Sequence, residues 1–148
     1  MMAEISDGTL FSYSVYNQEN ITSTAIFKLV DKENGTWERI YNNENLKNAL
    51  AGIVEFKGKI IGIISENQFR NPDLVYNPET GKFENIDAEF SRSVYGYAQQ
   101  VIVSKDKDVL MISVDNPIES SIIVTKDLKD WHYLTIENNQ YVRSWYIV

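Results

Sequence analysis

Two short stretches of the chain combine arginine with aromatic side chains. Residues 66–72 read Glu-Asn-Gln-Phe-Arg-Asn-Pro and residues 88–97 read Ala-Glu-Phe-Ser-Arg-Ser-Val-Tyr-Gly-Tyr, so two of the four arginines of the chain lie there. A planar guanidinium beside aromatic rings suits an anionic or flat ligand, because it donates paired hydrogen bonds and stacks on the rings. The candidate ligand-binding residues are Phe69, Arg70, Arg92, Tyr95 and Tyr97. In the alternative interpretation, these aromatic side chains pack under their loops or against a second subunit.

Acidic residues are numerous, but no pair has the surroundings of a catalytic pair. The chain has 21 Asp and Glu, and in a turn-rich chain most of these form turns or solvated faces. A glycoside hydrolase needs two carboxyl groups about 5–10 Å apart, one with its pKa raised by burial. Glu55, in the run Ile-Val-Glu-Phe, is one candidate partner, but an outward-facing strand residue is the simpler interpretation. We therefore expect no catalytic residue.

Metal and cofactor chemistry is limited by the residue types present. The chain has no cysteine and a single histidine, His132. This excludes disulfides, thiolate zinc sites, iron–sulfur clusters, a cysteine nucleophile and a metal centre with several histidines. His132 follows Trp131 in a predicted strand, where we expect it to be exposed or half-buried. Since no glycine-rich phosphate loop joins a strand to a helix, we expect neither a metal nor a cofactor.

The net charge of the 148-residue chain is −7, from 14 Lys and Arg against 21 Asp and Glu. An acidic surface repels phosphate backbones, so we expect no binding to long nucleic acid. No apolar run approaches the roughly 20 residues of a membrane helix. The start, Met-Met-Ala-Glu, lacks the basic and apolar regions of a signal peptide, so we expect a cytoplasmic protein without membrane contact. The abundance of Asn and Ile indicates an AT-rich coding genome, such as that of a low-GC bacterium or its phage.

The elements that must position these residues form an internal repeat. Three segments share an alternating apolar stretch, a polar turn, an aromatic residue and an apolar residue three positions later. The aromatic and apolar members are Trp37 and Ile40, Phe83 and Ile86, and Trp131 and Leu134. The aromatic residues lie 46 and 48 residues apart. Each segment is typical of a β-hairpin, and we expect its aromatic residue to pack between sheets.

A second hairpin precedes each of these segments, with inner strands that start at Leu10, Ile60 and Val109. The pattern predicts an all-β chain, a single domain over 1–148, built from three four-stranded antiparallel repeats. The repeats span about 1–42, 50–87 and 98–137, and a C-terminal closing strand spans 140–148. The only helical pattern is one turn near residues 45–50.

The second repeat resembles a β-propeller blade of the kelch type. Residues 56–63 resemble its first hairpin, and residues 75–84 its second, where an aromatic follows a Pro-x-x-Gly turn. Residues 124–131 are similar to the Asp-box of sialidase-like propellers, although the turn glycine is missing and the Asp lies one position closer to the aromatic. The resemblance implies blade-like sheets and no particular function, because propellers host many chemistries.

Three repeats are too few for a propeller, which closes with about four to eight blades. We expect propeller-like closure by homo-oligomerisation, in which two chains build a six-bladed ring; a single-chain β-trefoil or β-prism is the alternative. The strand 140–148 is too apolar for a free terminus, so we expect it to join an edge of a second copy or to pair near residues 4–6. Its candidate oligomerisation residues are Tyr141, Arg143, Trp145 and Tyr146.

The favoured function is that of a non-enzymatic binding protein, encoded by a phage and present as a homodimer. Its loop face, formed by residues 66–72 and 88–97, would capture a small anionic ligand, a glycan or a protein partner. The first alternative is a glycoside or phosphoester hydrolase that uses carboxylates at the same face. The second is a structural component of a virion.

Overall fold

The computed structural model describes residues 1–18, 21–43, 50–67, 73–87, 90, 96–115 and 120–135. Within these ranges the chain forms thirteen β-strands and no α-helix, which confirms the predicted all-β class. The strands are β1 (Met2–Glu4), β2 (Leu10–Gln18), β3 (Ile21–Asp31), β4 (Thr36–Asn43), β5 (Leu50–Phe56), β6 (Lys59–Ile64), β7 (Glu66–Asn67), β8 (Leu74–Asn77), β9 (Lys82–Asn85), β10 (Gly96–Val103), β11 (Leu110–Asp115), β12 (Ser120–Thr125) and β13 (Trp131–Thr135).

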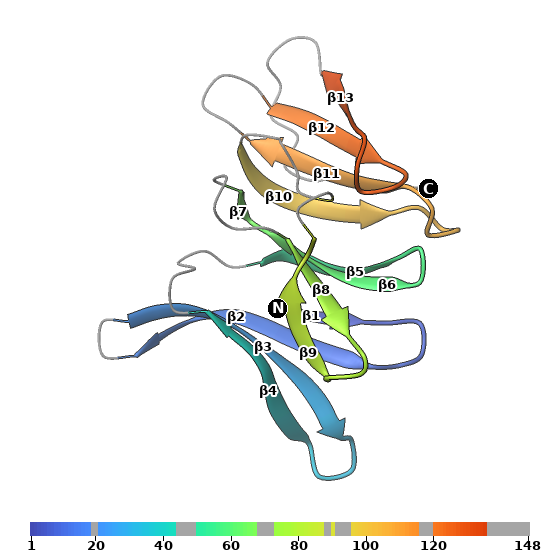
Figure 1. Cartoon of the computed structure of the whole chain (residues 1–148). Helices are drawn as coiled ribbons and strands as arrows, with labels where there is room; N and C mark the ends of the chain where they lie inside the picture. Colours follow the sequence, from blue (N-terminus) through green and yellow to red (C-terminus); the bar gives the residue numbers. More distant parts are fainter. Residues whose placement is uncertain are drawn as a thin grey trace.

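The strands form three antiparallel sheets that lie one above another in chain order (Figure 1). Sheet 1 contains β1 to β4, sheet 2 contains β5, β6, β8 and β9, and sheet 3 contains β10 to β13. These sheets are the three predicted four-stranded repeats. The sequence did not predict β7, a two-residue strand that leaves sheet 2 and adds to the β10 edge of sheet 3.

A tight turn joins the last two strands of each sheet and contains a residue in the left-handed conformation. Gly35 in sheet 1 and Gly81 in sheet 2 have φ angles of 66° and 69°. The corresponding turn of sheet 3 lacks glycine, and Leu128 takes the left-handed conformation with φ 68°. This costs a leucine roughly 1–2 kcal/mol. The cost is offset because the Leu128 side chain is 5% exposed and belongs to the core between sheets 2 and 3.

Two of these turns are closed by aspartate side chains. Asp31 accepts hydrogen bonds from the side-chain amide and the backbone N–H of Asn34, at 2.7 and 3.1 Å. Asp127 accepts one from the backbone N–H of Asp130 at 2.8 Å. The Asn34 amide lowers the pKa of Asp31, and the Asp130 N–H lowers the pKa of Asp127, because both donors favour the ionised carboxyl. These two carboxyl groups therefore shape turns.

Two apolar cores separate the three sheets, because successive strand residues point to opposite faces. We call the face of a sheet that points to the preceding sheet its upstream face, and the opposite face its downstream face. In sheet 1 the upstream face is the one that points away from sheet 2. The core between sheets 1 and 2 includes Phe11, Tyr13, Ile26, Ile53, Leu74 and Phe83. The core between sheets 2 and 3 includes Phe56, Ile61, Ile63, Leu110, Ile112 and Ile123. Sheet 2 is thus covered on both faces.

An aromatic cluster fixes sheet 2 on sheet 1. The rings of Phe11 and Phe83 meet edge to face at 5.6 Å, and the ring of Tyr76 lies 5.6 Å from Phe11 and 5.5 Å from Phe83. Gly62 makes room for this cluster, since a Cβ there would lie 3.3 Å from the Leu74 Cβ and 3.6 Å from the Phe83 ring. Polar contacts flank it: Lys28 of sheet 1 donates to the Tyr76 hydroxyl at 3.2 Å.

The three aromatic residues of the repeat are buried to different degrees, which corrects the expectation that all of them pack between sheets. Phe83 is 5% exposed, in the core between sheets 1 and 2. Trp131 is half-buried against the core between sheets 2 and 3. Trp37 is 38% exposed. Its strand lies in sheet 1, and no sheet of the described chain precedes sheet 1 to cover it.

Two predicted elements lie outside the described residues. They are the helical turn near residues 45–50, except for Leu50, which begins β5, and the closing strand 140–148. A helix of the length and hydropathy needed to cross a membrane is not found in the part of the chain that the structure describes.

Candidate functional site

The two arginine-bearing loops start from a shared base. Strand β7 begins the loop 66–72 and pairs with the start of β10, which ends the loop 88–97. Their register joins Asn67 with Gly96 and Glu66 with Tyr97. The backbone N–H of Ala98 donates to the Ser65 carbonyl at 2.7 Å, directly below. The first residues of the loop 66–72 and the last residues of the loop 88–97 therefore lie side by side.

Of the five predicted ligand-binding residues, Tyr97 is described. Its side chain is 45% exposed, while the next residue, Ala98, is 2% exposed and belongs to the core. Tyr97 therefore stands at the base of the loops with its ring accessible to solvent. The other four predicted residues, Phe69, Arg70, Arg92 and Tyr95, lie outside the described residues, as do the oligomerisation residues Tyr141, Arg143, Trp145 and Tyr146.

One aromatic residue of the second loop belongs to the packing. Phe90 is half-buried and packs against the core between sheets 2 and 3. The ammonium groups of Lys59 and Lys129 lie 5.1 and 5.0 Å from the centre of its ring. A cation near an aromatic ring is attracted by the negative charge on the ring face. For Phe90 the alternative interpretation of the loop aromatics is therefore correct, and sequence reasoning missed the two lysines because they come from different sheets.

Glu55 connects all three sheets at their hairpin turns. Its carboxylate lies 2.6 Å from the Lys107 ammonium in the β10–β11 turn. It also accepts hydrogen bonds from the hydroxyl and the backbone N–H of Ser6, in the β1–β2 turn, at 2.9 and 3.1 Å. The Lys107 hydrogen bond, followed by those from Ser6, lowers the pKa of Glu55 to about 2. Glu55 is thus ionised and held by partners on both sides, the opposite of the protonated acid that a hydrolase needs.

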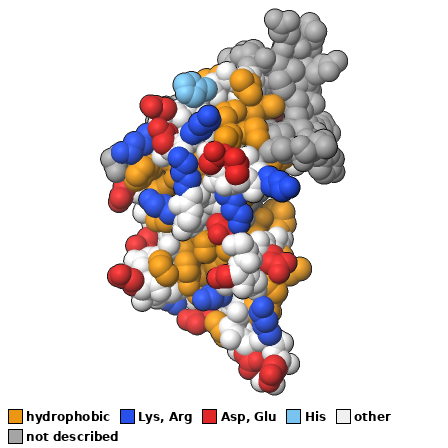
Figure 2. All heavy atoms as spheres, turned by 90° about the vertical axis from the view of Figure 1, so that its right-hand side faces the viewer, with side chains coloured by type: hydrophobic (Ala, Val, Ile, Leu, Met, Phe, Trp, Pro, Cys, Tyr) orange, Lys and Arg blue, Asp and Glu red, His pale blue; other side chains and the backbone are white. Residues whose placement is uncertain are grey.

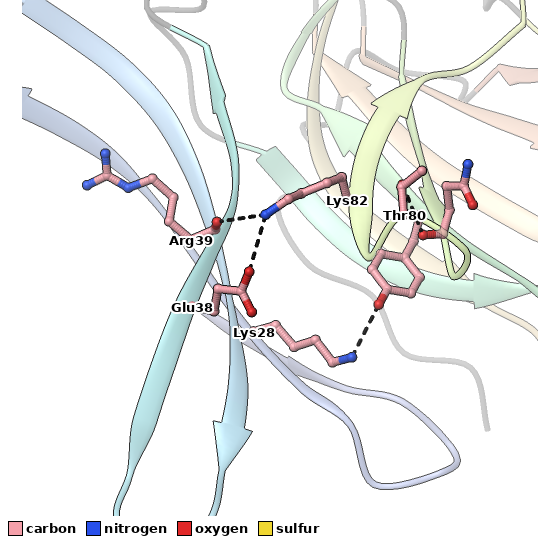
Figure 3. A network of polar contacts seen from close by, with 7 residues as sticks. Lys28, Glu38, Arg39, Thr80 and Lys82 are labelled. Atoms are coloured by element: carbon pink, nitrogen blue, oxygen red, sulfur yellow. Dashed lines mark hydrogen bonds and ion pairs between the residues drawn. The ribbon is translucent and has the colours of Figure 1, made fainter.

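Polar contacts also join the outer strands of sheets 1 and 2. Figure 3 shows Lys82, at the start of β9, reaching across to β4. Its ammonium group lies 3.3 Å from the Glu38 carboxylate and 3.5 Å from the Arg39 carbonyl. Both side chains of the ion pair are about half exposed, so it contributes little to stability. The contact shows that the outer strands β4 and β9 lie next to each other.

Two hollows lie near the hairpin turns. The larger, of about 490 Å³, is lined by Asp7 of sheet 1 and by Lys59, Tyr76 and Glu84 of sheet 2, among others. Hydrogen bonds from Thr9 lower the pKa of Asp7. The smaller, of about 340 Å³, is lined by Val124, Thr125, Lys126, Asp127, Asp130 and His132. Figure 2 views this side of the molecule and shows lysines and acidic residues interspersed over it, without a surface of one charge.

The described residues contain no cluster of three or more His, Cys, Asp and Glu side chains that would hold a metal ion. His132, the single histidine, is exposed at the rim of the smaller hollow. Comparison of the chain with protein-family models, with curated proteins and with solved structures gives no match. Among the described residues, the candidate site consists of the paired ends of the two loops and the exposed Tyr97.

Proposed function

We propose that the chain is a non-enzymatic binding protein that captures a small anionic ligand between the loops 66–72 and 88–97. The observation that carries the proposal is the pairing of β7 with β10, which joins the bases of the two loops. Both loops carry an arginine, and each has aromatic neighbours in sequence. Two guanidinium groups on adjacent loops bind phosphate or carboxylate by paired, charge-assisted hydrogen bonds, and an exposed tyrosine adds a stacking surface.

Among the described carboxyl groups, the pKa shifts offer no candidate for the proton donor of a hydrolase. Every shift resolved for a carboxyl group of the described chain is downward; the groups are Asp7, Asp31, Glu55, Asp106 and Asp127. Hydrogen bonds from turns and neighbouring sheets cause these shifts, and they keep the groups ionised at neutral pH. A glycosidase needs one carboxyl group whose pKa is raised so that it can donate a proton.

We also propose a type of fold and a way in which the three sheets close into a ring. We interpret the three sheets as propeller-like blades of the kelch or sialidase kind, closed into a six-bladed ring by a homodimer. Two features support blades over a trefoil or prism: apart from β7, each sheet is built from consecutive strands, and the sheets stack face to face in chain order. The cytoplasmic location and the phage origin expected from composition complete the proposal.

The test is native mass spectrometry of the protein as purified, which reports a carried-over ligand and the stoichiometry together. We then add adenosine monophosphate, glucose 6-phosphate and sialic acid as anionic probes. We expect a bound anion or a probe adduct with the wild type, and its loss in the variants Arg70→Ala and Arg92→Ala. Lys105→Ala is the matched control, because it removes an exposed cation from the β10–β11 turn, away from the loops.

Three results would contradict the proposal. The first is the absence of both a carried-over anion and any probe adduct at millimolar probe. The second is retention of the adduct in both arginine variants, which would place the anion elsewhere. The third is turnover of a glycoside or phosphoester by the purified protein, which would favour the hydrolase.

A further inference from the structure

The aromatic residue of each repeat lies on the upstream face of its sheet, and its exposure depends on what precedes that sheet. Phe83 of sheet 2 is covered by sheet 1 and is 5% exposed. Trp131 of sheet 3 packs against the core shared with sheet 2. Trp37 occupies the same place in sheet 1, where no described sheet precedes, and it is 38% exposed. The exposed tryptophan is thus the one that lacks a neighbouring sheet.

The apolar residue three positions later lies on the downstream face, because an odd spacing along a strand reverses the direction of the side chain. Its exposure therefore depends on the sheet that follows. Ile40 of sheet 1 is covered by sheet 2 and is 3% exposed, and Ile86 is covered by sheet 3 and is 7% exposed. Leu134 holds this place in sheet 3, and it is 52% exposed. Trp37 and Leu134 are therefore exposed on faces of opposite kind at the two ends of the stack, and no described sheet covers either face, although Ser113, on the same face as Leu134, is 2% exposed.

Further apolar side chains surround each exposed residue. On the upstream face of sheet 1, Leu29 pairs with Trp37 across β3 and β4, and Phe27 lies two residues along. On the downstream face of sheet 3, Ile122 pairs with Leu134, with Met111 and Val124 in the next row. None of these residues belongs to either core of the described chain. We call the first set the Trp37 face and the second the Leu134 face.

The geometry points to a second copy of this chain as the occupant of both faces: the Trp37 face of one copy packs on the Leu134 face of the other. Each junction inside the chain joins the downstream face of one sheet to the upstream face of the next. The Leu134 face and the Trp37 face are one of each kind, so they continue the same stacking. Two copies give two identical junctions and six sheets, within the range in which such rings close.

The internal junction of sheets 1 and 2 shows what the new contact looks like. There, Phe83 meets Phe11, the second residue of β2. Met111 is the second residue of β11, so it takes the place of Phe11 opposite Trp37, and a thioether packs well against an aromatic ring. The hollow of about 340 Å³ lined by Val124 and His132 lies at the turn end of the same face. Trp37 is also near its turn, as the second residue of β4.

This inference rests on the proposed homodimer and adds the surfaces that form it; it does not involve the strand 140–148. The test is sedimentation velocity over a range of concentrations, with circular dichroism to show that each variant is folded. We expect Trp37→Glu and Leu134→Glu each to weaken the wild-type dimer by roughly 30-fold or more, as for a central interface residue. Tyr133→Glu is the matched control: it is 53% exposed and adjacent to Leu134, but it points to the opposite face.

A mixture of the two variants distinguishes this arrangement from others. Trp37→Glu retains its Leu134 face and Leu134→Glu retains its Trp37 face, so the mixture forms one intact junction and associates again. A dimer in which like faces meet gains nothing from mixing. The inference is wrong if mixing restores no association, or if Tyr133→Glu weakens the dimer as much as Leu134→Glu.

The same measurements separate failure of this inference from failure of the homodimer itself. If the wild type is a monomer at every concentration, both are wrong. If it is a dimer that Trp145→Glu dissociates while Trp37→Glu and Leu134→Glu leave it intact, the homodimer stands. Its contact is then the C-terminal strand and not these faces. Ligand binding by the loops is read independently, from the probe adducts.

Discussion

Replacement of Phe83 by alanine tests whether equivalent positions in the repeat contribute differently to the free energy of unfolding, depending on whether another sheet covers them. Phe83 is 5% exposed; its ring contacts that of Phe11 edge to face and that of Tyr76 in a tilted arrangement. Removal of a buried phenylalanine side chain costs about 3–5 kcal/mol, because the cavity collapses only in part. Trp37→Ala removes a larger side chain that is 38% exposed, and in the monomer we expect it to cost at most about 2 kcal/mol.

The assay is urea unfolding at a concentration at which the chain is monomeric by sedimentation. For a slope near 2 kcal/mol/M, typical of small domains, Phe83→Ala lowers the midpoint by roughly 2 M, and Trp37→Ala by at most about half of that. A double-mutant cycle of Phe11→Ala and Phe83→Ala isolates the edge-on contact, for which we expect about 0.5–1.5 kcal/mol. The reasoning is refuted if Trp37→Ala costs as much as Phe83→Ala.

Three further substitutions test individual contacts. Glu55→Gln destabilises the protein at neutral pH, and the difference from the wild type disappears as the pH falls from about 4.5 to about 2. Because folding lowers the pKa of Glu55, the ionised carboxyl group stabilises the protein above its ordinary pKa of 4.5. This contribution is lost as the group is protonated at lower pH, and unfolding at several pH values measures the loss. Gly62→Ala lowers the melting temperature, since its Cβ would lie 3.3 Å from the Leu74 Cβ. The Cβ of Gly52→Ala would lie 3.4 Å from the Val101 side chain, so its melting temperature tests whether the packing of sheet 2 against sheet 3 adjusts to an added methyl group more easily. Leu128→Gly relieves a left-handed φ but loses a buried side chain, so we expect a net loss of about 1 kcal/mol by urea unfolding.

The sequence predicted the fold class and the repeat because these depend on local signals. Alternating apolar residues and turn residues such as Asn34 and Gly35 specify hairpins with little help from the rest of the chain. The predicted repeats at about 1–42, 50–87 and 98–137 match the three sheets for the same reason. The missing glycine of the third turn was visible in the sequence, but not that Leu128 would take its conformation.

Contacts between sheets were not predictable from the sequence. The strand β7 consists of Glu66 and Asn67, residues with little preference for strands, and it forms because its position beside β10 supplies the partner. The connection from Ser6 through Glu55 to Lys107 spans 101 residues in sequence, and each member alone has the pattern of an exposed turn or strand residue. No local rule brings these three residues together.

The strand patterns do carry one signal about position in the stack. In β6 the run Lys-Ile-Ile-Gly-Ile-Ile is apolar at both alternating positions, as a sheet with two covered faces requires. In β2, Ser12 and Ser14 occupy the upstream face, and in β11 Ser113 occupies the downstream face. The two end faces are therefore partly polar at their second strands, and their apolar area is concentrated nearer the outer strands, where Trp37 and Leu134 lie. For the proposed dimer, we therefore expect substitutions at the outer strands to weaken association more than substitutions at the serines, of which Ser113 is 2% exposed.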